Sequence, residues 1–295
     1  MIIQFLLPFY GEPALLRQAV DSVLSLDDPN WVLTVVDDCY PDETVGPYLE
    51  SLGDPRLRYV RNTRNLGAMG NTYRCLELAE HEFFTLLNAD DLVHPNYLTV
   101  VRRAFRDFPD AALVQPGVRV VDQDGSPVRS LADIVKRLIA PGPRDRQVLG
   151  GEALVASLLL GNWTYHPSLC WRRSAVEGIA HRQLAAVHDL ALIVDVVRAG
   201  GSLVVEPTVC FTYRRHLASD SSVAAAQGSR FVQERQYFSE ITSELVAQGW
   251  PKAARSGRVH LTSRLHALKM VPAALRTSQR GPAMRWLLRH ALGPS

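Results

Sequence analysis

The sequence predicts an α/β protein with a mostly parallel central sheet. Short apolar runs alternate along the chain with segments whose apolar residues recur three and four residues apart. Each run ends at a proline or at a cluster of polar residues, which is typical of buried strands. Because consecutive parallel strands need a crossover connection, this alternation favours a parallel sheet with helices on both faces.

The first 116 residues hold the most regular part of this alternation. Strands are expected at residues 2–7, 31–36, 57–60, 83–87 and 112–115. Helices are expected at residues 13–24, 45–52, 69–79 and 95–108. The first strand follows Met1 with neither a basic segment nor a small-residue cleavage site, so we interpret it as a strand and not as a signal peptide.

The alternation is looser after residue 116. Segments rich in polar, proline and glycine residues are expected to form a turn at 122–127 and loops at 141–146 and 161–167. Further strands are expected at 168–171 and 203–213, and helices at 151–160 and 189–199. From residue 229 the pattern is helical.

Composition places the chain among ordinary soluble globular proteins. Hydrophobic residues make up 47% and charged residues 21% of the 295 residues, and the net charge is +2. The charge is uneven, because the last acidic residue is Glu244 and nine lysines and arginines follow it. The longest apolar stretch, 153–160, is far too short to span a bilayer. The four cysteines lack metal or redox spacing, which indicates reduced thiols in a cytoplasmic protein.

Polar side chains follow four of the expected strands. Tyr10, Asp38 and Arg64 come after the first three, and Asp90 and Asp91 come directly after the fourth. Parallel strands end at one edge of the sheet, where open α/β proteins bind ligands. Adjacent carboxylates suit Mg²⁺ or Mn²⁺, which are commonly held by carboxylates together with substrate phosphates. The alternative is that one carboxylate caps the next helix, but capping does not account for Tyr10 and Arg64.

Six short motifs follow one another in chain order. They are PFYGE at 8–12, DDCYPDET at 37–44, NLGAMGN at 65–71, LNADD at 87–91, VHDLAL at 187–192 and YRRH at 213–216. Together they resemble the motifs of family 2 glycosyltransferases over roughly residues 1 to 220. The resemblance implies a GT-A fold, that of the nucleotide-diphospho-sugar transferases. It also implies an inverting enzyme of the hexosyltransferase class (EC 2.4).

The resemblance implies a role for each matching residue. Asp189 is expected to be the general base, which removes the proton from the acceptor hydroxyl. Divalent Mn²⁺ or Mg²⁺ is the expected cofactor, with Asp91 the preferred ligand, Asp90 at the metal or the ribose, and His216 a further ligand. The nucleotide is expected to contact Pro8, Tyr10, Glu12, Asp38, Arg64, Asn88 and Asp90.

Two residues depart from the family pattern, and one aromatic residue has two interpretations. Asn88 replaces the first aspartate of the Asp-x-Asp motif, and His188 replaces the usual glutamate beside the base. Asn162, Trp163 and His188 are expected near the acceptor or the donor sugar, because aromatic faces suit sugar C–H groups. Trp163 is equally typical of a protein core.

The expected organisation is a catalytic domain with a tail. Residues 1–222 form the GT-A domain, with a nucleotide-binding half at 1–116 and an acceptor-binding half at 117–222, and residues 223–295 form a basic helical extension. In the tail, Leu261, Leu265 and Leu268 share one helical face, and a second face runs from Met284 to Ala291. Basic amphipathic helices bind anionic membranes, so 251–292 is expected either to hold the enzyme at the inner face of the cell membrane or to pack on protein.

The expected reaction transfers a sugar from a UDP- or dTDP-sugar to a carbohydrate, lipid-linked or small-molecule acceptor. Cell-envelope polysaccharide, glycolipid and glycosylated natural-product synthesis are the fitting pathways. The alternative is a non-catalytic sugar-nucleotide-binding or scaffold protein, which Asn88 suggests. A nucleotidyltransferase or a dinucleotide oxidoreductase would need a glycine-rich loop after the first strand, and PFYGE is not one. No motif supports nucleic-acid binding.

Overall fold

The structure is a computed structural model that describes residues 1–128, 131–141, 146–180, 182, 184, 186–215, 229–275 and 280–293. Strands among these residues are β1 (Ile3–Phe9), β2 (Trp31–Asp37), β3 (Leu57–Arg61), β4 (Phe83–Leu86), β5 (Leu92–Val93), β6 (Leu113–Val121), β7 (Gln147–Gly150), β8 (Cys170–Arg172) and β9 (Ser202–Arg214). Helices among them are α1 (Pro13–Leu24), α2 (Val45–Ser51), α3 (Gly67–Glu77), α4 (Tyr97–Asp107), α5 (Leu131–Ile139), α6 (Gly151–Leu160), η1 (His166–Ser168), α7 (Arg173–Val176), α8 (His188–Arg198), α10 (Ser229–Ala247), α11 (Pro251–Val259), α12 (Leu261–Ala274) and α13 (Arg280–Leu292).

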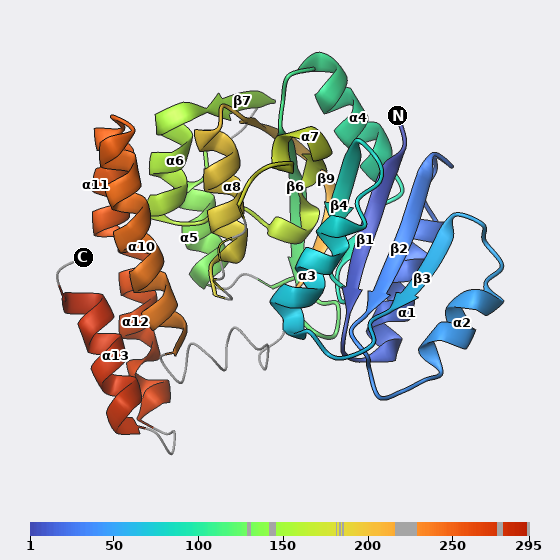
Figure 1. The fold of residues 1–295 in the computed structure, drawn as a ribbon, viewed down its shortest axis with the longest axis horizontal. Coiled ribbons are helices and arrows are strands. Elements are labelled where there is room, and N and C mark those ends of the chain that lie inside the picture. Colours follow the sequence, from blue (N-terminus) through green and yellow to red (C-terminus); the bar gives the residue numbers. More distant parts are fainter. Residues whose placement is uncertain are drawn as a thin grey trace.

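The strands form one sheet whose order is β3-β2-β1-β4-β8-β6-β9-β5, with β7 paired to β9 (Figure 1). The neighbours β3, β2, β1 and β4 are all parallel, as the alternating pattern predicts. In the second half, β6 and β9 are parallel, whereas β8, β5 and β7 run antiparallel to their neighbours. The predicted α/β fold with a mostly parallel sheet is confirmed, and the antiparallel strands β7 and β8 lie where the sequence alternation is looser.

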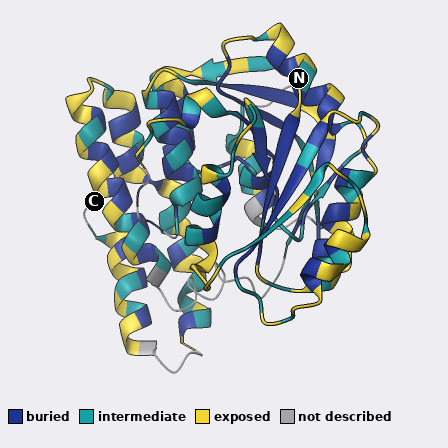
Figure 2. Cartoon of the chain, turned by 45° about the vertical axis from the view of Figure 1, so that its right-hand side comes forward, coloured by how far each residue is buried: buried dark blue, intermediate teal, exposed yellow. Residues whose placement is uncertain are grey.

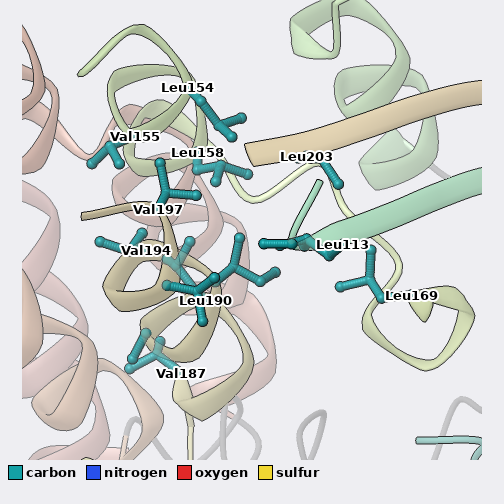
Figure 3. Close-up of a cluster of buried hydrophobic side chains, with 14 of the residues drawn as sticks. Leu113, Leu154, Val155, Leu158, Leu169, Val187, Leu190, Val194, Val197 and Leu203 are labelled. Carbon is teal, nitrogen blue, oxygen red and sulfur yellow. The ribbon is translucent and has the colours of Figure 1, made fainter. Parts of the chain in front are cut away.

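Helices cover both faces of the sheet, as expected. One core cluster joins α1, α2 and α4 to the sheet through residues such as Leu16, Leu49 and Val101. The other joins α3, α6 and α8 to the opposite face, and Figure 3 shows its leucine and valine side chains interdigitating between α6, α8 and the strands. These faces hold the strand ends in fixed positions, because densely packed interiors allow little displacement.

One strand boundary differs from the prediction for a clear reason. The strand expected at 112–115 stops at Pro116, because proline lacks the N–H that a sheet needs. In the structure β6 runs on to Val121, and its register with β9 shifts on both sides of Gly117. A Cβ at Gly117 would lie 2.5 Å from the Pro207 carbonyl oxygen, so only glycine allows this close approach. Helix α5, strand β7 and the two-residue β5 are not expected from the sequence pattern.

The C-terminal helices pack on α6 and α8 and on one another, at the end of the molecule away from β2 and β3 (Figure 1). Tyr237, Ile241 and Leu245 of α10 and Ala253 of α11 belong to the same core cluster as α6 and α8. The helical tail predicted from residue 229 is therefore present, and its first two helices share the core that α6 and α8 form with the sheet. The division into 1–116, 117–222 and 223–295 stays a prediction.

Helices α12 and α13 form a smaller cluster with Phe231 at its centre. The two apolar faces predicted in the tail have different surroundings here. On α13, Leu287 and Ala291 are buried against the neighbouring helices, whereas on α12 Leu265 is 54% exposed. Figure 2 shows exposed residues along the outer side of these helices, in contrast to the buried strands. The α12 face is therefore directed to solvent.

Candidate active site

The loops after the parallel strands meet at one edge of the sheet. The Asp38 N–H donates to the Phe9 carbonyl oxygen at 2.9 Å, and the Leu87 N–H donates to the Leu6 carbonyl oxygen at 2.9 Å. These bonds join the ends of β2 and β4 to β1. The predicted residues that follow the strands consequently lie along a single edge, as parallel strands require.

The buried Asp38 side chain lies against the N-terminus of α3. Its Oδ1 accepts hydrogen bonds from the Leu66 N–H at 2.8 Å and from Asn62 Nδ2 at 2.9 Å. Its Oδ2 accepts the Gly67 N–H at 2.9 Å. Negative charge is favoured at a helix N-terminus, where N–H groups lack helical partners. Three of the four lone pairs of the carboxylate are used in this way, so one on Oδ2 remains for a ligand.

The neighbouring Asp37 has a structural role, as the sequence suggests. It is fully buried and accepts the Tyr59 hydroxyl at 2.5 Å and the Tyr40 N–H at 2.7 Å. Burial and this carboxylate raise the pKa of Tyr59 to about 12, so the phenol keeps its proton. Asp37 thus ties β2 to β3 and fixes the turn that carries Asp38.

Tyr10 presents an open aromatic ring at the same edge. Its ring is 54% exposed, and it meets the Tyr40 ring edge-on at 5.3 Å between centroids. Tyr40 packs in turn on Phe9 at 5.2 Å, which anchors the group to β1. An exposed aromatic ring that a neighbouring ring holds in place is suited to stacking on a flat ligand.

The remaining residues predicted to contact the nucleotide differ in how they are held. Pro8 lies within β1, and Glu12 is exposed immediately before α1. Arg64 is exposed in the loop after β3 and has no ion pair with another described residue. Asn88 is half-buried after β4. Their part in nucleotide binding stays a prediction.

The acidic pair after β4 combines one buried and one partly open carboxylate. Asp91 is fully buried; its Oδ1 accepts the Arg214 N–H of β9 at 2.8 Å, and its Oδ2 has no hydrogen-bond partner in the described protein. Burial, followed by the charge of Asp90, raises the pKa of Asp91 well above its usual value. Asp90 is half-buried. A cation would relieve both the burial and the repulsion.

The donor set fits a hard divalent metal ion. Two carboxylates after a strand supply oxygen ligands, and the unpartnered Oδ2 of Asp91 is a buried acceptor beside Asp90. Mg²⁺ and Mn²⁺ are held in this way when substrate phosphates complete their shell. No group of three or more histidine, cysteine, aspartate or glutamate side chains with metal-site geometry occurs among the described residues. The third predicted ligand, His216, lies outside the described residues.

Asp189 stands in the first turn of α8, as the sequence predicts. Its Oδ2 accepts Asn162 Nδ2 at 3.2 Å. Burial acts to raise the pKa of Asp189, but His188, His166, the Leu190 N–H and Arg230 outweigh it, so the pKa is lowered. Burial lowers the pKa of His166 to about 4, so that ring is neutral at pH 7. The lowered pKa leaves the Asp189 carboxylate ionised at neutral pH.

The loop 162–165 orients the Asp189 carboxylate from the other side. Asn162 Oδ1 accepts the Thr164 hydroxyl at 2.6 Å and the Thr164 N–H at 3.2 Å, which turns the amide NH₂ toward Asp189. Trp163 is only 4% exposed and donates its Nε1–H to Ser157 Oγ at 3.0 Å, so most of the ring is core. The centroids of the His188 and His166 rings lie 5.8 Å apart. Contact of these residues with a sugar stays a prediction.

Several charged residues around Asp189 are missed by the sequence analysis. Asp133 of α5 accepts two hydrogen bonds from Arg215 and one from the Tyr165 hydroxyl. Lys136 of α5 donates to the Thr164 carbonyl oxygen at 2.5 Å and lies over the Tyr165 ring. These residues follow no motif. The only sequence signal is the helical spacing of the apolar residues between 131 and 139, which gives the helix but not its position.

Tyr213 connects the two groups of carboxylates. Burial raises its pKa to about 12, and the charges of Asp91, Asp90 and Asp189 all act in the same direction. The centroid of its ring lies 5.3 Å from that of the Tyr165 ring. The acidic pair and the predicted base are therefore close enough to act on one phenol.

Within the described residues, none of the helices combines the length and apolar character that a membrane crossing requires.

Comparison with known proteins identifies the family of the chain. The sequence model described as glycosyl transferase family 2 matches residues 5–177. WcaA of Escherichia coli, named for colanic acid biosynthesis, is 35% identical over 100 residues, which are 34% of this chain and 36% of WcaA. The succinoglycan biosynthesis protein ExoO of Rhizobium meliloti is 27% identical over 225 residues, which are 75% of this chain and 63% of ExoO. The chain thus spans less than two thirds of either relative.

A solved structure of similar fold is TarS of S. aureus in complex with UDP-GlcNAc. It superposes with a TM-score of 0.69 at 15% identity and covers 99% of this chain and 82% of the TarS chain. The mannosyltransferase PcManGT of Pyrobaculum calidifontis, in complex with GDP-Man and Mn²⁺, superposes with a TM-score of 0.60 at 15% identity, over 98% of this chain and 79% of its own. The predicted GT-A fold is confirmed by these superpositions.

Proposed function

Since the chain belongs to glycosyl transferase family 2, we propose that it transfers a sugar from a nucleoside diphosphate sugar to an acceptor hydroxyl with inversion of configuration. The observation that carries this proposal is the placement of an ionised Asp189 near the Asp90–Asp91 pair, with both acting on Tyr213. A direct displacement needs these two functions: a base for the acceptor and charge neutralisation for the leaving diphosphate.

On the nucleotide side, the proposed donor is a UDP- or dTDP-sugar. The free lone pair of Asp38 Oδ2 can accept the imide N–H of a uracil or thymine, and the exposed face of Tyr10 can stack on the base. Asn88 and Asp90 are proposed to reach the ribose, and Arg64 a phosphate or the base. The TarS complex with UDP-GlcNAc supports a uridine donor, whereas the GDP-Man complex of PcManGT supports only the general class.

The divalent ion is assigned to Asp90 and Asp91. When bound, Mn²⁺ or Mg²⁺ would neutralise charge on the diphosphate. The half-buried Asp90 is better placed to face substrate than Asp91, so we propose Asp90 as the main ligand, although the sequence favours Asp91. Asp91 accepts a hydrogen bond from the Arg214 N–H, which helps to fix the position of the adjacent Asp90.

Asp189 is proposed to accept the proton of the acceptor hydroxyl as that oxygen bonds to the anomeric carbon and the bond to the diphosphate breaks. Asn162 orients the carboxylate for this transfer. Because the pKa of Asp189 is lowered, the carboxylate is ionised at neutral pH and needs no prior deprotonation. General bases of this kind contribute roughly 10²–10⁴-fold to the rate.

The acceptor is proposed to be a growing cell-surface polysaccharide. The names of WcaA and ExoO refer to colanic acid and succinoglycan biosynthesis, which supports this choice over a glycolipid or a small natural product. The test is a thermal-shift panel of UDP-, dTDP- and GDP-sugars with and without Mn²⁺, followed by a donor-turnover assay. A ligand stabilises the protein as its concentration exceeds Kd, so the true donor should raise Tm most.

The panel also discriminates the alternative of a non-catalytic binding protein. Such a protein would bind a nucleotide sugar yet neither hydrolyse nor transfer it under any metal condition. If no nucleotide sugar raises Tm, both interpretations are wrong.

A second proposal concerns location: the enzyme acts at the cytoplasmic face of the cell membrane, where α12 contacts lipid. Leu261, Leu265 and Leu268 are all more than 40% exposed on this helix. Exposed cations on the same helical tail include Arg258 and Lys269, and no acidic residue follows Glu244. Apolar side chains among cations match the chemistry of an anionic lipid surface.

Flotation with vesicles of phosphatidylcholine and phosphatidylglycerol tests this proposal. We expect Leu265→Glu to reduce co-flotation several-fold, since it removes an apolar contact and adds repulsion. Val246→Glu is the matched control, because Val246 is 53% exposed but lies on α10. Equal flotation of the two variants, or none of the unmodified protein, would sink the idea. Deleting the tail is a poorer test, because α10 and α11 contribute to the catalytic core.

A further inference from the structure

A cavity of about 320 Å³ lies beside the loop that orients Asp189. Its walls come from β6, α5 and residues 162–165. None of the loops that directly follow β1, β2, β3 and β4 contributes a residue to it. Val118, Val120 and Ile134 form an apolar part of the wall, and Lys136 and Arg119 bring charge to it. Ligand pockets in proteins range from about 300 to 1,000 Å³, so the cavity is large enough for one sugar ring.

The charge of this cavity is positive. Arg119 is exposed and has no ion pair with another described residue. Lys136 uses one ammonium hydrogen on the Thr164 carbonyl oxygen, which leaves two donors. The acid in the wall, Asp133, is already neutralised by the Arg215 guanidinium, which donates to both of its oxygens. Within the described part of the chain, neither Lys136 nor Arg119 forms an ion pair, so both cations can pair with an anionic ligand.

The cavity and the proposed base share structural elements. The loop 162–165 reaches Asp189 through Asn162 and reaches the cavity through Trp163 and Tyr165. The charge of Asp189 acts directly on Lys136, so the two groups are close in space. A sugar ring in the cavity could thus present a hydroxyl toward Asp189 while a second substituent meets Lys136.

We propose that this cavity binds the acceptor sugar through an anionic substituent, a carboxylate or a phosphate, that pairs with Lys136 and Arg119. The term acceptor rests on the proposed function; the binding of an anionic sugar does not. Both substituents share the required chemistry, since each offers oxygen acceptors and a negative charge to an ammonium and a guanidinium group. A neutral sugar would leave both cations unpaired.

The experiment measures binding of three probes to the full chain in the absence of donor, by saturation-transfer NMR. The probes are methyl β-glucuronide, glucose 6-phosphate and methyl β-glucoside. We expect at least one anionic sugar to bind about tenfold or more tightly than the neutral glucoside, because charge-assisted hydrogen bonds are about twice as strong as neutral ones. The better of the two anionic probes identifies the substituent.

Variants assign this binding to the cavity. Lys136→Met should weaken the preferred anionic probe about tenfold, and Lys136→Arg should keep most of the affinity because it retains the charge. Lys252→Met is the matched control, because Lys252 is exposed on α11, outside the cavity. An unchanged melting temperature of each variant shows that the fold is intact.

The outcomes separate this proposal from the proposed function. If all three probes bind equally, if neither anionic sugar binds, or if Lys136→Met binds like the unmodified chain, the cavity proposal is wrong. Failure of the protein to turn over any nucleotide sugar would instead contradict the proposed function. Because the probes are titrated without donor, each result stands on its own.

Discussion

The proposed nucleotide side of the site, around Asp38, Asp90 and Asp91 (the nucleotide edge), and the proposed acceptor side, around Asp189 and Asp133 (the acceptor edge), hold their charged groups in different ways. At the nucleotide edge, Asp38 and Asp91 accept backbone N–H groups from neighbouring loops and strands. At the acceptor edge, Asp189 and Asp133 are held mainly by side chains such as Asn162 and Arg215, from segments far apart in sequence. Charges fixed by backbone depend on the fold alone, whereas charges fixed by side chains depend on several individual residues.

The largest expected effect is the loss of the base at the acceptor edge. Asp189→Asn should lower the transfer rate by roughly 10²–10⁴-fold, because the amide cannot take the acceptor proton. The donor Kd should change little, since Asp189 is assigned to the acceptor side. Single-turnover transfer and donor titration measure the two quantities. Asp124→Asn, at the exposed turn after β6, is the matched control, and a variant at Asp189 that keeps full transfer would remove the base assignment.

The next largest effect is expected at the nucleotide edge. Asp90→Asn should raise the Mn²⁺ concentration needed for half-maximal activity by at least about tenfold, because a charged oxygen ligand is lost. The readout is the rate as a function of Mn²⁺ at saturating donor. Asp91→Asn should show the smaller change if Asp90 is the main ligand. The reverse order would restore the preference for Asp91 that the sequence suggests.

A stability effect should follow the loss of charge at Asp38. Asp38→Asn should destabilise the protein by about 1–3 kcal/mol, because an amide NH₂ replaces an acceptor facing the Gly67 or Leu66 N–H. Urea unfolding measures this change. Glu43→Gln is a suitable comparison, because Glu43 is exposed in the following turn. Equal stability of the two variants would show that the α3 N-terminus does not depend on the buried carboxylate.

The smallest effect is a pH dependence of anionic-sugar binding at the acceptor edge. Burial lowers the pKa of Lys136 to about 8; Asp189 and Asp133 act to raise it, and Arg215 and Arg230 to lower it. The charged ammonium is present below this pH and is lost as the pH rises through it. Affinity for the anionic probe should thus fall by up to about tenfold per pH unit above 8. Lys136→Arg should abolish this fall, and an identical pH profile in that variant would contradict the role of Lys136.

Sequence reasoning succeeds where one strand and its following loop determine the position. Asp38 and Asp90 follow apolar runs, so the parallel sheet alone places them at one edge.

Sequence reasoning fails where packing between distant segments determines the position of a residue. Asp91 meets the Arg214 N–H across 123 residues, and no local pattern announces that contact. Lys136 lies on a helix that carries no motif, and its position in the cavity wall depends on the loop against which α5 packs.

The tail shows the same limit. Spacing gives both α12 and α13 an apolar face, but spacing does not say what each face packs on. Leu287 is buried against the other helices, and Leu265 is open to solvent.

The end of a strand shows a similar limit. Pro116 suggests that the strand ends there, whereas Gly117 lets β6 continue because it allows β9 to approach closely.

The ion-pair network between α8 and α10 has a consequence for protein engineering. Glu244 of α10 binds Arg182 at 2.7 Å and Arg198 at 2.5 Å, and both arginines also bind Asp195 of α8. The helix that presents Asp189 is therefore braced by the tail. A chimera that joins this catalytic half to the tail of another glycosyltransferase must supply an acid at the position of Glu244. Without it, two partly buried guanidinium groups would share one carboxylate, and α8 would hold Asp189 less firmly.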